Sequence, residues 1–207
     1  MSLSKGSLTY ARFFVEGDRP DVDACLAAIR LRAFRPLKAT DELDESVGWC
    51  SVHHHIDLDL THEKAFDGDF ITLGLRTDRW KIPGAIMAAH MREAETAMLA
   101  ELGKDRLSRT QKEDLRAMVE RKLRERSMPA MRVYDLAWDT DAGVVRFFAT
   151  SPKVHDVLHE LFEKTFGCRL IPEGVYTRAE RLGLTASELD ALCTILPFVI
   201  HREDDDQ

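Results

Sequence analysis

Two histidines one helical turn apart form the stretch of this sequence that most resembles a catalytic motif. The segment from His155 to Glu160 reads HDVLHE. It differs by one methylene group from HExxH, in which two histidines bind zinc and the intervening glutamate is the general base. Asp156 takes the place of that glutamate, and its carboxylate reaches about 1.5 Å less far, the length of one C–C bond. It would therefore hold an attacking water poorly.

A zinc site also needs a third ligand, and the candidates for it are weak. The run 53–55 is three histidines, but adjacent residues of an extended segment alternate sides, so at most two share a face. On a helix, His155 and His159 lie at the flank of an apolar face, with Asp156 on the opposite, solvated side. We interpret HDVLHE as a structural helix and expect no metal and no cofactor. The four cysteines contain no CxxC pair and are typical of reduced thiols: Cys25, Cys50, Cys168 and Cys193.

Other signatures of enzymes and membrane proteins are also missing from the sequence. The glycines form neither GxGxxG nor GxxxxGK[ST], and no GxSxG elbow occurs. We therefore expect a protein that is not an enzyme. No apolar run approaches the length needed to span a bilayer, and the N-terminus has no signal-like apolar segment. These features predict a cytoplasmic protein without a membrane partner.

The distribution of charge points more clearly to a function. The chain carries a net charge of −7, yet the window 104–126 holds nine basic and five acidic residues, a local charge of +4. A basic stripe on an acidic protein can attract a polyanion locally. From the charges alone, a solvated helix with i,i+4 ion pairs is the slightly favoured interpretation. The candidate phosphate contacts are this window and the end of the preceding strand: Arg76, Arg79, Lys81, Lys104, Arg106, Arg109, Lys112, Arg116, Arg121, Lys122, Arg124 and Arg126.

Start and stop signals outline the elements that must position these residues. Asp21, Ser108, Ser151 and Thr185 are N-caps of predicted helices, and Gly143 suits the turn of a hairpin. The loop 35–47 is predicted to end in a turn at Gly48-Trp49. The predicted strands are 8–15, 69–77, 131–138, 144–149 and 168–171, and the predicted helices are 21–34, 83–102, 108–126, 151–167 and 185–196.

The order of these elements indicates an α+β fold with mainly antiparallel sheets flanked by helices. We expect one region over residues 1–176, followed at 177–207 by a C-terminal helical segment with an acidic tail.

Several short motifs follow one another in an order that resembles the recombination-associated protein RdgC family, over about residues 8–175. They are 33–36 (AFRP), 47–49 (VGW), 81–83 (KIP), the basic helix 107–115, the turn 139–143, the helix start 149–153, and Phe166-Gly167 leading to Pro172. The sequence departs from the family in two places. The family continues well beyond Pro172, so the fold is expected to be RdgC-like but truncated at the C-terminus. In addition, 124–129 (RERSMP) replaces a leucine-leucine-proline followed by an aromatic residue.

The resemblance implies a cytoplasmic, nucleoid-associated protein that binds DNA without sequence preference and restrains recombinase-driven strand exchange. It also implies a homodimer that closes a ring with a basic channel around duplex DNA. The expected partners are thus the phosphate backbone of DNA, a second copy of the chain, and a recombinase. An alternative is a protein-interaction or regulatory module that kept the fold but lost DNA binding.

Overall fold

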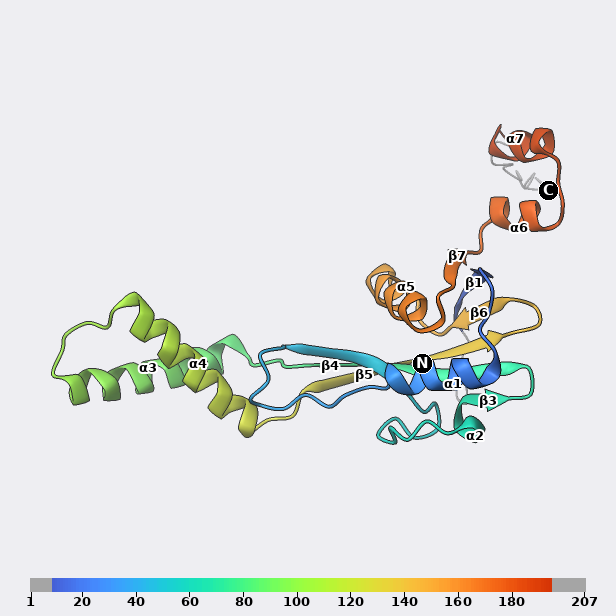
Figure 1. Cartoon of the computed structure of the whole chain (residues 1–207). Coiled ribbons are helices and arrows are strands. Elements are labelled where there is room, and N and C mark those ends of the chain that lie inside the picture. The colour runs from blue at the N-terminus through green and yellow to red at the C-terminus, as the bar shows by residue number, and fades with distance from the viewer. Residues whose placement is uncertain (1–8, 195–207) are drawn as a thin grey trace, which may run out of the picture.

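The chain forms one curled, seven-stranded antiparallel sheet flanked by helices, in a computed structural model that describes residues 9–194 (Figure 1). The strand order is β2-β4-β5-β6-β1-β7, and β3 pairs with the start of β4. The predicted α+β, antiparallel class is confirmed. The strands are β1 (Ala11–Glu16), β2 (Glu45–Cys50), β3 (Phe66–Asp67), β4 (Phe70–Arg79), β5 (Ala130–Asp139), β6 (Val144–Phe147) and β7 (Arg169–Pro172). The helices are α1 (Val22–Leu31), α2 (His62–Ala65), α3 (Gly84–Leu102), α4 (Arg109–Glu125), α5 (Pro152–Phe166), α6 (Val175–Arg181) and α7 (Ala186–Thr194).

Local signals explain several helix ends. The Asp21 side chain accepts a hydrogen bond from the Ala24 amide and caps α1, and Ser108 forms a capping box with Gln111 at the start of α4. Gly103 and Gly167 end α3 and α5 in the left-handed conformation that glycine adopts without a steric penalty. These predicted boundaries are confirmed to within a few residues.

The predicted turn at Gly48-Trp49 is wrong, because both residues lie inside strand β2, paired with β4. The chain after α1 crosses this strand so closely that a Cβ atom on Gly48 would lie 2.5 Å from Cα of Phe34. The Phe34 amide donates to the Trp49 carbonyl at this crossing, at 2.8 Å. Gly48 is therefore required for a close backbone approach and does not make a turn.

The sequence patterns also missed the short elements α2, β3 and α6. Each is seven residues or shorter, so its hydrophobic periodicity is too brief to register. The first residue of the predicted strand 8–15, the last two of the predicted helix 185–196, and the acidic tail lie outside the described residues.

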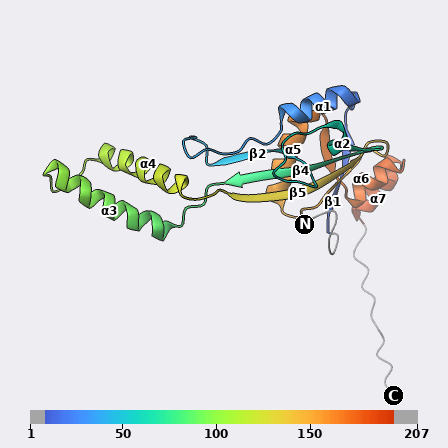
Figure 2. The same cartoon turned by 90° about the horizontal axis from the view of Figure 1, so that it is seen from below.

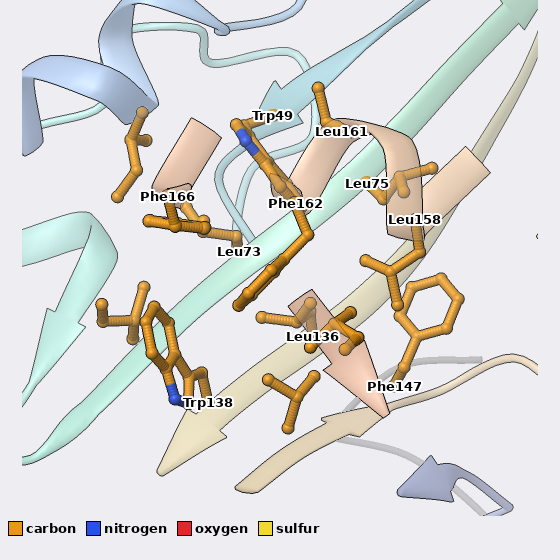
Figure 3. Packing of buried hydrophobic residues seen from close by; sticks show 14 of the residues in the cluster. Trp49, Leu73, Leu75, Leu136, Trp138, Phe147, Leu158, Leu161, Phe162 and Phe166 are labelled. Carbon is orange, nitrogen blue, oxygen red and sulfur yellow. The ribbon is translucent and has the colours of Figure 1, made fainter. Parts of the chain in front are cut away.

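A single apolar core joins one face of the sheet to α5 (Figure 3). Trp49 of β2 and Trp138 of β5 are each at most 1% exposed and pack against Phe166 of α5, with ring centroids 6.3 and 5.1 Å apart. The Trp49 indole N–H donates to the Thr165 hydroxyl at 2.8 Å, so this buried donor is satisfied. The core thus fixes α5 over the middle of the sheet.

Helices α3 and α4 form a hairpin inserted between β4 and β5, here named the helical arm (residues 84–126). It projects from the ends of these two strands, at the opposite end of the molecule from α6 and α7 (Figures 1 and 2). Leu115 and Val119 of α4 are buried, whereas α3 buries none of its residues. Few side chains are therefore enclosed in the arm, and most of its surface faces solvent.

The crossing at Gly48 yields a stability prediction. Gly48→Ala should lower the free energy of unfolding by about 1–3 kcal/mol, because the added methyl group meets backbone atoms that can move only with α1. Gly84→Ala is the matched control, since no atom lies within 4 Å of its added Cβ. It should leave stability unchanged or raise it by up to ~1 kcal/mol. Urea unfolding followed by circular dichroism makes the comparison, and equal stabilities for the two variants would refute the role of Gly48.

Candidate nucleic-acid interface

The face of β4 that carries the core changes character along the strand. Its inward residues Ile71, Leu73 and Leu75 are at most 1% exposed, Thr77 is half-buried, and Arg79 is exposed. These five residues point to the same side because side chains of a strand alternate between its faces. The apolar core therefore gives way to a basic, solvent-facing end on a single continuous strand.

Strand β5 changes in the same way, because it pairs with β4 over ten residues. Leu136 lies opposite Leu73 and is buried, whereas Tyr134 is half-buried and Arg132 is exposed. Opposite residues of an antiparallel pair lie on the same face. The two strands thus present Arg79 and Arg132 together, beyond the edge of the core.

These strand ends, with the first turn of α5, enclose a groove of about 660 Å3, here named the β4–β5 groove. Four cationic side chains and a single carboxylate, that of Glu45, line it. Within residues 9–194, none of the four cations has a carboxylate within 4.0 Å. The groove is therefore positively charged. Its lining residues are Glu45, Thr77, Arg79, Trp80, Lys81, Ile82, Ala130, Arg132, Tyr134, Lys153, Val154 and Val157.

The N-terminal end of α5 adds to this charge. Lys153 and Val154 belong to its first turn and line the groove. Backbone N–H groups at a helix N-terminus carry a partial positive charge, which favours anions nearby. The Ser151 side chain makes no capping hydrogen bond there. The N-terminal end of α5 and the Lys153 side chain therefore both favour an anion in the groove.

Two aromatic side chains, Trp80 and Tyr134, lie among the cations of the groove. Both are half-buried. The indole N–H of Trp80 is buried and has no hydrogen-bond partner among the described residues. Because this N–H is enclosed, Trp80 can offer a ligand in the groove only the accessible part of its ring.

Ten of the twelve predicted phosphate-binding residues are exposed, and Arg76 is one of the two exceptions. Its guanidinium donates to both carboxylate oxygens of Asp78, at 2.9 and 2.6 Å, and to the His55 carbonyl. It also stacks over the Phe34 ring at 4.1 Å. The hydrogen bonds to Asp78 raise the pKa of Arg76. Arg76 is thus a structural ion pair on the sheet face opposite to the groove.

Arg124 is the second exception, with a side chain only 8% exposed. It donates to the carboxylates of Glu120 and Asp44 and to the Asp41 carbonyl, and it lies over the Trp80 ring at 5.7 Å. Its partners come from α4 itself and from the loop before β2. Arg124 therefore anchors the base of the helical arm to the body of the protein.

The exposed cations of α4 do not form one uniform stripe. Arg109 pairs with Glu113 within α4, and Lys112 pairs with Glu95 of α3, each at 2.9 Å. At 100° per residue, Lys122 lies 240° around the helix from Arg116, so the two face different directions. Because α3 is acidic, the whole arm holds ten basic and eight acidic residues, a net charge of only +2. The predicted i,i+4 ion pairs and the basic stripe are thus both present in part.

The histidines of HDVLHE lie beside a different pocket, of about 760 Å3, where both rings meet Phe13 edge-on with centroids 5.3 Å away. His155 Nε2 is 2.8 Å from the Ala149 carbonyl. Burial and the neighbouring His155 lower the pKa of His159. Across the described part of the chain, no three His, Cys, Asp or Glu side chains gather as a metal site. These contacts support a structural role for the pair.

The candidate contacts predicted from the sequence include Arg79 and Lys81 of the groove. They do not include Trp80, Arg132, Tyr134 and Lys153. The sequence did contain a signal for the two residues of β5. Every second residue of this strand lies on one face, and on this face the side chains change from apolar to basic: Trp138, Leu136, Tyr134 and Arg132. Lys153 gave no such signal, because only the packing of α5 brings it to the same end of the sheet.

No protein-family model matches this chain, and a comparison with curated proteins finds no match either. None of the helices within residues 9–194 has the length and apolarity of a membrane span.

The anchoring role of Arg124 is testable by mutation. Arg124→Met should lower the free energy of unfolding by about 1–3 kcal/mol, since it removes charge-assisted hydrogen bonds from a buried side chain. Arg121→Met, an exposed neighbour on the same helix, should change it by no more than about 0.5 kcal/mol. Denaturant titrations of both variants measure the difference. A decrease at Arg124 no larger than that at Arg121 contradicts the assignment.

Proposed function

We propose that the protein binds DNA without sequence preference, through contacts between the phosphate backbone and the β4–β5 groove. The observation that carries this proposal is the gathering of Arg79, Lys81, Arg132 and Lys153 around one groove with no ion-pair partner among the described residues. Cations without neighbouring carboxylates retain their attraction for phosphates, whereas paired ones such as Arg76 are already neutralised. The groove is therefore the centre of the interface.

The residue composition disfavours one mode of sequence readout. Adenine edges are commonly read by asparagine or glutamine making paired hydrogen bonds. The chain has no asparagine and only two glutamines, Gln111 and Gln207. Gln111 is engaged in the capping box of α4. Contacts from lysine and arginine to phosphates supply affinity without sequence information.

The helical arm extends the proposed contact surface. Its cations Lys104, Arg106, Arg116, Arg121, Lys122 and Arg126 are exposed and have no ion pair within the described part of the chain. Following the resemblance to the RdgC family, the proposed role is a cytoplasmic, nucleoid-associated protein that restrains recombinase-driven strand exchange. A homodimer and a contact with a recombinase belong to the same proposal, while Arg76 and Arg124 are left out of the DNA interface.

A protein-interaction or regulatory module is the second candidate, and the helical arm favours it. The net charge of the arm is only +2, and α3 leaves Ile86 46% exposed. Met128, just beyond the arm, is 92% exposed. Such a module would bind DNA weakly or not at all.

Replacing the four groove cations separates these candidates. A variant with Arg79, Lys81, Arg132 and Lys153 all changed to Gln should bind duplex DNA more weakly than the wild type. The slope of log K against log salt should become shallower by roughly 0.9 for each phosphate that the variant no longer neutralises. Fluorescence anisotropy at several salt concentrations measures both quantities.

The matched control changes four other exposed basic residues to Gln: Arg19, Arg32, Lys38 and Arg181. They lie outside the groove and, among the described residues, also have no carboxylate within 4.0 Å. This control alters the net charge by the same amount and should have a smaller effect on affinity and slope. Equal effects of the two quadruple variants would mean that DNA affinity follows the net charge of the protein and does not depend on the groove. Absence of binding by the wild type at low salt would overturn the DNA-binding function and favour the interaction module.

A further inference from the structure

We propose that the β4–β5 groove holds a single nucleic-acid strand, with a base stacked on Trp80 or Tyr134, and that it discriminates against duplex DNA. This inference rests on the proposed function and specifies which nucleic acid the groove accepts. Three features of the groove support it: its size, its aromatic residues, and the placement of its cations.

The size of the groove suits a strand. Sites of about 300–1,000 Å3 typically enclose ligands the size of a drug molecule, and a nucleotide is of this size. The groove, at about 660 Å3, falls within this range. A double helix is too wide to enter such a space and would meet only its rim. A single strand can place a sugar and a base inside it.

The aromatic residues favour unpaired bases. In a duplex the faces of the bases are covered by their neighbours, whereas a single strand can expose a base face to a protein ring. Trp80 and Tyr134 are half-buried in the walls of the groove, so their rings are held while part of each stays accessible. Contacts between cations and the phosphates of a duplex would not involve either ring.

The cations lie on three elements around these rings. Arg79 and Lys81 flank Trp80 in sequence, Arg132 is two residues from Tyr134 on the same face of β5, and Lys153 comes from α5. Phosphates of a strand can therefore reach a cation on either side of a stacked base. A charged groove interleaved with stacking rings is the usual chemistry of single-strand binding.

The experiment compares three polyanions binding to the full chain at one salt concentration. They are a twelve-nucleotide oligo(dT), a blunt twelve-base-pair duplex, and inorganic polyphosphate of the same charge as the oligo(dT). We expect oligo(dT) to bind more tightly than polyphosphate, because stacking of each base adds on the order of 5- to 100-fold. It should also bind more tightly than the duplex.

Intrinsic fluorescence supplies a second readout. Trp49 and Trp138 are buried, at 0 and 1% exposure, so quenching by a bound strand should come from Trp80. The quench by oligo(dT) should disappear in Trp80→Phe. Tyr134→Leu should weaken the binding of oligo(dT) at least fivefold and leave the affinity for polyphosphate unchanged. Tyr10→Leu, which alters an exposed tyrosine outside the groove, is the control.

The outcomes distinguish this inference from the function on which it rests. If duplex, oligo(dT) and polyphosphate bind with equal, salt-sensitive affinity, the single-strand inference is overturned and DNA binding stands. If oligo(dT) is preferred but Tyr134→Leu and Trp80→Phe have no effect, the groove is not the site and the inference is again overturned. If none of the three polyanions binds, both proposals fail. Tyr134→Leu could fail to fold. In that case the fluorescence of Trp80→Phe, which keeps an aromatic ring at this position, still tests whether the strand binds in the groove.

Discussion

The structure depends on a difference in length between the central strand pair and the helix that covers it. The β4–β5 ladder is ten residue pairs long, about 34 Å at the usual rise per residue. The fully buried residues on the core face of β4 end at Leu75, and Tyr134 opposite it is already half-buried. Beyond this point the same face must meet water, and polar side chains replace apolar ones. The groove therefore occupies the part of the sheet that lies beyond the core.

The same geometry explains how a protein with a net charge of −7 can present a basic surface. Coulombic attraction between exposed charges is screened within about 8–10 Å at physiological salt, so local charge outweighs the total. In the groove, four cations face one carboxylate. On the sheet face opposite to the groove, Arg76 is held by Asp78, and at the base of the arm Arg124 is held by Asp44 and Glu120. Arginines of this chain are thus either buried in ion pairs or, as in the groove, exposed without a carboxylate partner among the described residues.

Predictions from the sequence succeeded where the determining contacts are local. The caps at Asp21 and Ser108 and the glycine stops involve neighbouring residues, so the helix ends could be predicted directly. Strand β2 around Gly48 could not be predicted in this way. Its glycine is required because the segment after α1 passes close to the backbone of β2. Arg124 resembled its exposed neighbours because Asp44, which buries it, lies 80 residues earlier. For the same reason the groove could be predicted only in part: Lys153 joins Arg79 and Arg132 through the packing of α5.

The most direct test of the proposal that DNA binds at the groove is lysine footprinting by mass spectrometry, with and without saturating DNA. Lys81 and Lys153 lie in the groove, Lys104 and Lys122 on the helical arm, and Lys164 at the far end of α5. If the groove is the centre of the interface, DNA should slow acetylation of Lys81 and Lys153 most, that of the arm lysines less, and that of Lys164 not at all. Protection confined to the arm, or equal at every lysine, would contradict a binding site at the end of the sheet.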